Sequence, residues 1–445
     1  MVGALAIGVI APGAVAGSVE TSADSVLLAQ GINPHPVRLT TPPAKPLSAM
    51  AQLGRRLFHD ANLSGSERMS CASCHDPVHA YGPPGPVSVM VGGPDMHAAG
   101  FRAVPSLRYL YRQPAFTIGP DTSSGDNDAA PTLQQQSQQA LAHDKVLKTA
   151  LSPQAASVNL VPQGGIFWDG RADTLQQQAS GPLFNPAEMA ASTPESVATR
   201  IEHAKYAPAF RGLFGPNVFE NSKLLMSEAM FAIARYQIED TSFHPFTSKY
   251  DSWLEGNARL TAAEARGYLA FNDPAKGNCA ACHLDKPTQD GLPPLFTDTQ
   301  YEALGVPRNA AIPANRDAGY YDLGICGRAD MRDQVQFCGM FLTPSLRNTA
   351  TRKVFFHNGA FHTLDEVMDW YVNRDLQPER FYSRDASGQV TQYDDLPAQY
   401  RRNVDTADAP FNRHPGDRPA LDSREIQDVI AFLRTLTDGY RAGGH

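Results

Sequence analysis

The sequence predicts an all-α fold of two similar domains that are related by an internal duplication. Three observations support this prediction. A Cys-x-x-Cys-His motif occurs at residues 71–75 and again at 279–283. The segments that follow each motif repeat in the same order, as expected for a duplicated chain. Apolar residues recur at helical spacing in several long segments, and strand signals are few.

Each Cys-x-x-Cys-His motif predicts a covalently bound c-type haem, so both domains are expected to be cytochrome c-like haem domains. In this motif the two thiols join the porphyrin, and the histidine is the proximal ligand of the iron. These residues are Cys71, Cys74 and His75 in the first motif and Cys279, Cys282 and His283 in the second. A zinc ribbon is disfavoured because its cysteine pairs lie about 15–20 residues apart. A thioredoxin-like site is disfavoured because no βαβ pattern surrounds either motif.

The repeat extends beyond the haem motifs. Residues 103–110, AVPSLRYL, match residues 342–349, LTPSLRNT, and residues 166–183 match residues 354–372. The second match sets four pairs of positions opposite each other: Gly170 and Gly359, Leu175 and Leu364, Trp168 and His357, and Pro182 and Tyr371. Where the paired residue types differ, the two haem sites are expected to differ in chemistry.

Several helices can be placed from their start signals and apolar spacing. Thr193 before Pro194 predicts the start of one helix. Residues 223–240 predict a buried helix. Thr261 and Glu264 form a capping box that starts the helix before the second motif. Residues 423–440 carry apolar side chains at helical spacing near the end of the chain.

Composition and segment patterns predict the domain boundaries and the compartment. Residues 1–45 are expected to be a signal-like segment followed by a proline-rich tether, which indicates export to the periplasm. Residues 46–245 and 246–445 are expected to form the first and second haem domains. No later segment predicts a membrane span, and a net charge of −8 argues against nucleic-acid binding.

Cys326 and Cys338 are the two cysteines outside the haem motifs, and they lie twelve residues apart. In an exported protein they are expected to form a disulfide that closes a loop. The alternative is a pair of buried free thiols.

Residues near Pro182 are expected to form the distal side of the first haem. Proline offers no side-chain donor, so the iron keeps an open site for peroxide. A partly desolvated Glu188 can move a proton between the peroxide oxygens, and Gln178 can position peroxide or a water molecule. The alternative for Glu188 is a solvated carboxylate at a helix end. His97 was weighed as a sixth ligand in a resting state, against an exposed loop histidine.

Tyr371 is expected to close the second haem, because a phenolic oxygen can ligate ferric iron. Two alternatives stay open. Tyr371 can instead be a helix tyrosine packed in the core. Met368, three residues earlier on the same helical face, can ligate the iron through its thioether sulfur.

From about residue 47 to residue 440 the chain resembles the bacterial di-haem cytochrome c peroxidase and MauG family. The segments that carry the resemblance are RRLFHDANLSGSERMSCASCH, FWDGRADTLQQQASGPLFNPAEM, CAACH, TPSLRN and FFHNGAFHTLDEVMDWY. It implies two all-α cytochrome c-like domains that hold two covalent haem c groups, with a calcium ion between them. The tyrosine at 371, where plain peroxidases of the family have methionine, makes the chain more similar to the MauG and MbnH-like branch.

The resemblance also implies roles for individual residues. Trp168 is the aromatic residue between the haems, Gln178, Pro182 and Glu188 form the distal pocket of the peroxide-binding haem, His357 lies near the second haem, and Tyr371 is its axial ligand. The calcium site of the family uses an asparagine where this chain has Ala103. The remaining calcium ligands would be backbone carbonyls near Arg352 and Val354.

These predictions describe a periplasmic di-haem peroxidase-type oxidoreductase. Hydrogen peroxide is expected to react at the His75 haem, to share its oxidising equivalents with the His283 haem through Trp168, and so to oxidise a partner protein. One alternative is a plain cytochrome c peroxidase that takes electrons from a small cytochrome or copper protein. The other is a di-haem electron carrier without catalysis.

Overall fold

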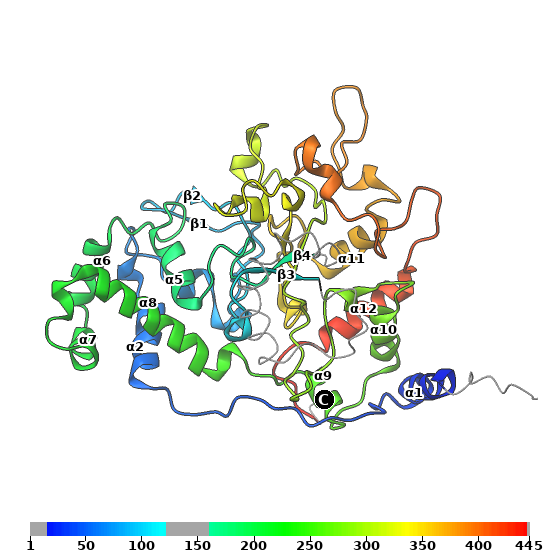
Figure 1. Ribbon diagram of the computed structural model, residues 1–445, viewed down its shortest axis with the longest axis horizontal. Coiled ribbons are helices and arrows are strands. Elements are labelled where there is room, and N and C mark those ends of the chain that lie inside the picture. Colours follow the sequence, from blue (N-terminus) through cyan, green and yellow to red (C-terminus); the bar gives the residue numbers. More distant parts are fainter. Residues whose placement is uncertain (1–15, 122–159, 443–445) are drawn as a thin grey trace, which may run out of the picture.

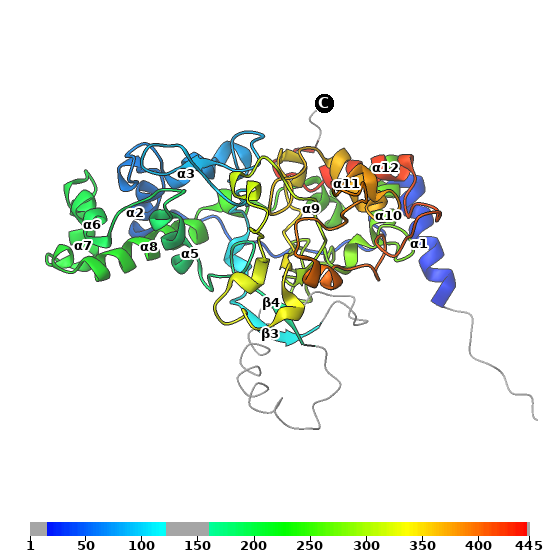
Figure 2. The ribbon, with the colours of Figure 1, turned by 90° about the horizontal axis from the view of Figure 1, so that it is seen from above.

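The computed structural model describes residues 16–121 and 160–442, and its framework is helical (Figure 1). After α1 (Ala16–Gln30), the N-terminal half contains α2 (Ala49–Phe58), α3 (Cys71–Cys74), α5 (Leu175–Phe184), α6 (Pro194–His203), α7 (Ala207–Phe214) and α8 (Ser222–Glu239). The C-terminal half contains α9 (Lys249–Leu254), α10 (Ala262–Asn272), α11 (Leu364–Asn373) and α12 (Ser423–Arg434). The two halves lie side by side, with α6 and α7 at one end and α10 and α12 toward the other (Figure 2).

The predicted helix starts agree with the structure. Thr193 caps α6 and Thr261 caps α10, each by accepting a hydrogen bond from a backbone N–H of the first turn. The side chain of Glu264 returns a bond to the backbone of Thr261, which completes the predicted capping box. The helices predicted from residues 223–240 and 423–440 are α8 and α12.

Short strands accompany the helices, and the sequence analysis did not place them. They form three antiparallel pairs: β1 (Val91–Gly92) with β2 (Ala98–Ala99), β3 (Thr117–Pro120) with β4 (Leu160–Gln163), and β5 (Tyr301–Glu302) with β6 (Phe341–Leu342). A single bridge from Gln163 to Gln300 joins the second pair to the third. The strands therefore tie loops of the two halves together, and they do not form a layer of their own.

The same helix crossing occurs in both halves. The helix that precedes each Cys-x-x-Cys-His motif packs across the last long helix of its half, α2 on α8 and α10 on α12. A β-carbon added to Gly54 would lie 1.8 Å from the carbonyl oxygen of Ala232. A β-carbon added to Gly267 would lie 1.9 Å from the carbonyl oxygen of Asp428. Only glycine permits this approach of two backbones, so each crossing depends on one residue.

Replacing either crossing glycine with alanine is expected to destabilise the protein. Gly54→Ala and Gly267→Ala should each lower the free energy of unfolding by about 2–3 kcal/mol, because the helices must separate to admit the methyl group. Gly212→Ala in α7 is the matched control, since no atom lies within 4 Å of its added β-carbon. Denaturant unfolding of the haem-loaded protein measures all three. Equal midpoints for Gly54→Ala and Gly212→Ala would show that the crossing tolerates a side chain.

Each half has its own apolar core. The first core draws on α2, α6, α7 and α8 and includes Phe58 and Phe210. The second draws on α9, α10, α11 and α12 and includes Phe271 and Phe432. Leu27 of α1 also packs in the second core, where it is only 3% exposed. The start of the described chain therefore belongs to the packing of the C-terminal half.

The segment after α1 continues along the C-terminal half before it reaches α2. The carbonyl oxygen of Gly31 accepts hydrogen bonds from the indole of Trp253 and the amide of Leu260. The amide of Val37 donates to the carbonyl of Leu254 at 2.9 Å. Figure 1 shows this segment in blue, running from α1 beneath the molecule to α2. The residues predicted as a proline-rich tether are thus attached to the domain that lies last in the chain.

Buried ion pairs hold the two halves together. Arg102 contacts Asp169 at 2.8 Å and Asp322 at 2.6 Å. Arg108 contacts Asp438 at 3.0 Å, near the end of the described chain. Breaking one partner of a pair in such a position leaves an unpaired buried charge, which is costly. These pairs therefore set the relative position of the halves.

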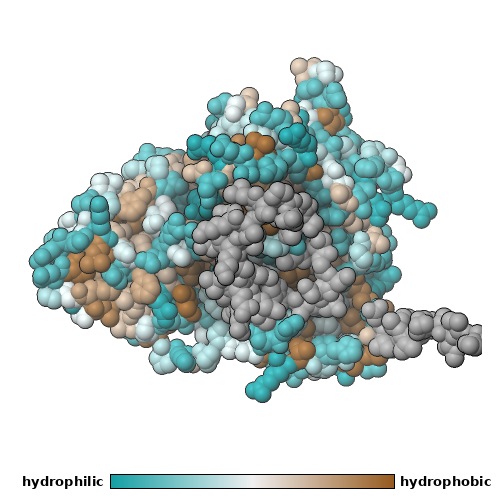
Figure 3. Space-filling model, viewed as in Figure 1, coloured by the Kyte–Doolittle hydropathy of each residue, from teal (hydrophilic) through white to brown (hydrophobic). Residues whose placement is uncertain are grey.

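The surface gives two further observations. No helix among the described residues is long and apolar enough to cross a bilayer. The face in Figure 3 is most hydrophobic over the end formed by α6, α7 and α8. Leu213, Leu224 and Phe231 are exposed on these helices. In the C-terminal half, Cys326 and Cys338 form a disulfide, which confirms the predicted bond.

Candidate functional site

A cavity of about 40 Å³ lies beside the first Cys-x-x-Cys-His motif. Its lining contains the three motif residues together with the three predicted distal residues: Cys71, Cys74, His75, Gln178, Pro182 and Glu188. The two groups lie more than a hundred residues apart in the sequence, and α3 and α5 bring them to one site.

Both motif histidines are oriented in the same way. The Nδ1 atom of His75 lies 3.1 Å from the carbonyl oxygen of Tyr81, and Nδ1 of His283 lies 2.9 Å from the carbonyl oxygen of Phe296. These contacts require the proton on Nδ1, so Nε2 keeps its lone pair for iron. Tyr81 and Phe296 both adopt left-handed backbone conformations, with φ of 55° and 56°. The two halves thus present the proximal ligand by one design.

The repeated PSLR segments support these histidines. The hydroxyl of Ser106 donates to the carbonyl of Ala80 at 2.6 Å, and that of Ser345 donates to the carbonyl of Leu295 at 2.6 Å. Each carbonyl belongs to the residue just before the one that accepts the histidine bond. The sequence marked these segments as a repeat but did not indicate this role, which depends on contacts between distant segments.

Glu188 is partly buried at the first cavity. Burial raises the pKa of its carboxyl group, and this effect outweighs the opposing influence of Arg171 and of a hydrogen bond from Asn185. The Nδ2 atom of Asn185 donates to Glu188 Oε1 at 2.7 Å, which fixes the carboxyl group. The environment is therefore not that of a solvated helix-end carboxylate. A carboxyl group with a raised pKa is suited to proton transfer near neutral pH.

Two glutamines complete the polar lining of the first cavity. Gln178, predicted from the sequence, lines both this cavity and the larger one described below. Gln237 of α8 was not predicted, because a glutamine in a long helix gives no signal of its own. It is 3% exposed, and its Oε1 atom has no hydrogen-bond partner within the described part of the chain. An unpaired buried oxygen beside the cavity fits a bound group that brings a donor.

A larger cavity of about 310 Å³ lies beside the second motif. One face of α11 lines it, through Leu364, Val367, Met368, Tyr371 and Val372. Cys279, Cys282 and His283 line it as well. The first cavity is lined in the same register by Gln178, Ala179 and Pro182 of α5. The proline and the tyrosine that the alignment pairs therefore hold equivalent places in the two sites.

Tyr371 and Met368 differ in their surroundings. Burial raises the pKa of the Tyr371 phenol, and the thiols of Cys279 and Cys282 raise it further, so the phenol lies close to the second motif. Met368 is buried in the second apolar core. Both side chains line the cavity, but only the phenol is electrostatically coupled to the haem-attachment cysteines.

Trp168 and His357 are linked through one residue between them. The indole N–H of Trp168 donates to the carbonyl of Ala103 at 2.8 Å, and the amide of Ala103 donates to the carbonyl of His357 at 2.7 Å. The His357 ring stacks on Phe341 with centroids 3.5 Å apart. Both predicted residues line the larger cavity, which also reaches Gln178 of the first site. Trp168 is therefore positioned between the two sites.

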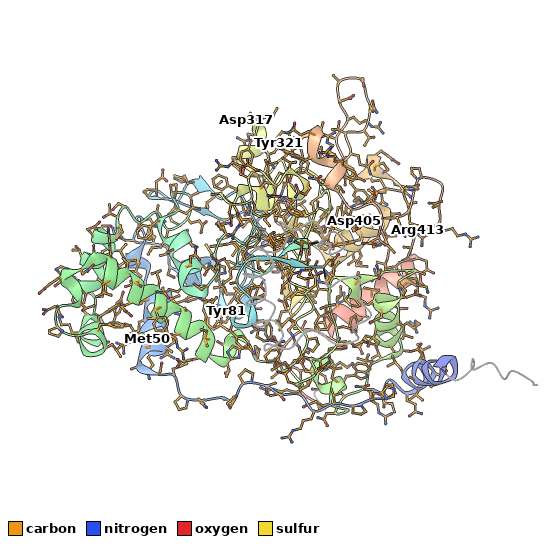
Figure 4. All side chains as sticks on the ribbon, viewed as in Figure 1. Met50, Tyr81, Asp317, Tyr321, Asp405 and Arg413 are labelled. Carbon is orange, nitrogen blue, oxygen red and sulfur yellow. A yellow bond between two sulfur atoms is a disulfide. The ribbon has the colours of Figure 1, made fainter. Side chains whose placement is uncertain are left out.

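Carboxyl groups gather around the second site. Burial raises the pKa of Asp298 to about 7 and that of Glu302 to about 8. Glu302, Asp405 and Asp408 line the larger cavity. Figure 4 marks Asp405 in the C-terminal half and Tyr81, beside the first motif, in the other half. An acidic surrounding stabilises additional positive charge at the second site.

His97 lies outside this arrangement. It is exposed, its backbone is held by Asp95, and it is absent from the lining of the first cavity. The interpretation as an exposed loop histidine therefore agrees with the structure.

The residues around both cavities fit a haem group. Each site has two thiols, a histidine whose Nε2 is free for iron, and a largely apolar lining. Arg352 adds a buried guanidinium group at the edge of the larger cavity, where the carboxylates of a bound haem would meet it.

The residues present do not fit a calcium ion. No group of three or more His, Cys, Asp and Glu side chains that could hold a metal ion occurs within residues 16–121 and 160–442. Ala103 is buried and offers no side-chain oxygen. The carbonyl oxygen of Val354, one of the expected ligands, accepts a hydrogen bond from Arg352 instead.

Comparisons with known proteins agree with this geometry. A family model described as di-haem cytochrome c peroxidase matches residues 48–259. The chain is similar to methylamine utilization protein MauG of Paracoccus denitrificans, at 31% identity over 91% of this chain and 92% of that protein. It is also similar to cytochrome c551 peroxidase of Nitrosomonas europaea, at 27% identity over 81% and 82%. The crystal structure of the diheme peroxidase BthA from Burkholderia thailandensis matches with a TM-score of 0.74 at 35% identity, covering 91% and 89%.

Proposed function

Because the chain belongs to the di-haem cytochrome c peroxidase and MauG family of oxidoreductases, we propose that it uses hydrogen peroxide to oxidise a partner protein in the periplasm. Its two halves would derive from one duplicated haem domain, and each would bind a haem c covalently through its Cys-x-x-Cys-His motif. The repeated helix crossing and the repeated histidine support are the observations in favour of duplication.

When bound, the haems supply the iron chemistry that cleaves peroxide and stores oxidising equivalents. Glu188 accepts a proton from peroxide and returns it to the departing oxygen, which leaves as water. Gln178 orients peroxide for this transfer. Pro182 offers no donor atom on that side, so the peroxide site stays open.

The difference between the two cavities carries the proposal. α5 presents Pro182 to the first site, whereas α11 presents Tyr371 to the second. One site is suited to bind peroxide, and the other is suited to hold a phenolate oxygen on its iron. Trp168 passes electrons from the second site to the first, and the acidic groups around the second site favour the positive charge that remains there.

A partner protein is the proposed electron source because Tyr371 distinguishes this chain from plain peroxidases. The relatives leave both roles open, since they include a methylamine utilization protein and a cytochrome c551 peroxidase. The plain peroxidase is therefore retained as the second candidate.

Adding one equivalent of hydrogen peroxide to the ferric, haem-loaded protein tests the proposal. We expect a defined spectral change at both haems that persists for seconds or longer and reverses when a reductant is added. Slow bleaching without a defined intermediate would instead identify a non-catalytic electron carrier. Rapid steady-state turnover with a reduced small cytochrome or copper protein would favour the plain peroxidase.

A further inference from the structure

Arg352 carries a buried charge that no carboxylate of the described residues neutralises by an ion pair. It lines the larger cavity, and burial lowers its pKa to about 10. A neighbouring carboxylate would have raised that pKa. Arg102, Arg108 and Arg347, which line or adjoin the same region, each form an ion pair with an aspartate.

The guanidinium group of Arg352 is held by backbone oxygens from both halves. Its Nε atom donates to the carbonyl of Val354 at 3.3 Å, and one terminal nitrogen donates to the carbonyl of Val104 at 3.0 Å. The other terminal nitrogen lies 3.5 Å from where a β-carbon of Gly82 would stand. Gly82 follows the first haem motif, so the group lies where the first site meets the second half.

This is also the position at which the family resemblance implies a calcium ion, and its oxygen atoms are already engaged. The carbonyl of Val354 accepts the Arg352 bond, and the carbonyl of Ala103 accepts the Trp168 indole. Calcium needs about six to eight oxygen ligands, and Ala103 supplies none from its side chain. A divalent cation placed a few ångströms from the guanidinium group would also be repelled by it.

We propose that the guanidinium group of Arg352 takes the place of a bound calcium ion at the junction of the two halves. It fixes the carbonyls of Val104 and Val354, and its remaining donors face the carboxylates of bound haem. Guanidinium is suited to this role because its five donors have fixed directions and its charge is permanent. The protein therefore needs no calcium to hold its two haem sites in register.

The metal content of the haem-loaded protein tests this directly. After incubation with millimolar calcium and removal of unbound ions, we expect far less than one calcium per chain by mass spectrometry. Its unfolding midpoint and haem spectrum should be the same in calcium and in a calcium chelator. One tightly held calcium per chain would overturn the proposal. This result does not depend on reactivity with peroxide, so it can fail or succeed independently of the proposed function.

A pair of variants tests the role of the charge. Arg352→Gln is expected to lower the reduction potentials of both haems, because removing a nearby positive charge disfavours the reduced iron. It should also lower the unfolding midpoint, since two inter-segment hydrogen bonds are lost. Lys353→Gln removes the same charge from the adjacent, exposed residue and should change neither quantity. Equal potentials in the two variants would overturn the proposal, and the metal measurement on the unaltered protein decides the case if Arg352→Gln does not fold.

Discussion

Glu188→Gln is expected to slow the reaction with hydrogen peroxide by about 10²- to 10³-fold while both haems remain attached. Glutamine keeps the size of the side chain and its contact with Asn185, but it cannot accept a proton. Glu188 lines the first cavity together with His75 and Pro182, where a proton must move from one peroxide oxygen to the other. Stopped-flow absorbance of the ferric protein after peroxide addition measures the rate.

The pH dependence gives this prediction its sign. Only the carboxylate accepts a proton, and burial raises the pKa of Glu188 above its ordinary value. The rate should therefore rise with pH through that raised pKa and be lost as the pH falls below it. Glu188→Gln should lose this limb of the profile. Glu220→Gln, at an exposed glutamate of the same half, is the control and should keep both rate and profile. A Glu188→Gln protein with an unchanged profile would place the proton acceptor elsewhere.

The parts of the site that could be predicted from sequence are those fixed by short-range spacing or by the repeat. The cysteines and histidine of each motif are adjacent in the chain, so their spacing alone indicates haem attachment. Comparison of the repeats paired Pro182 with Tyr371, and the structure gives these residues equivalent places on α5 and α11. The internal repeat thus served as a substitute for structural superposition.

The parts that could not be predicted depend on contacts between distant segments. Nothing in the sequence distinguishes Gln237 from other helical glutamines, and only the packing of α8 turns it toward the cavity. Arg352 was considered only for its carbonyl, whereas its side chain makes the contacts described above. The strands of two to four residues are too short to produce an alternating pattern.

Tyr371→Phe is expected to shorten the lifetime of the peroxide-oxidised protein at least about tenfold, because the second iron loses its phenolate ligand. The substitution keeps the ring, which packs against Phe411 with centroids 5.2 Å apart, and removes only the oxygen. The ferric electron paramagnetic resonance spectrum should change at one haem and not at the other. Peroxide should still bind at the first site, since Tyr371 does not line that cavity.

Two further variants separate the rival ligands of the second iron. Met368→Leu preserves the apolar packing of α11 and should leave both the spectrum and the oxidised lifetime unchanged, because the thioether is not the ligand. Tyr371→Met should instead give a thioether-ligated iron with a higher reduction potential. A higher potential makes the oxidised second site less stable, so this variant should take electrons readily from a small cytochrome and behave as a plain peroxidase. If Met368→Leu alters the second haem and Tyr371→Phe does not, Met368 is the ligand and the distinction between the two branches must rest on another residue.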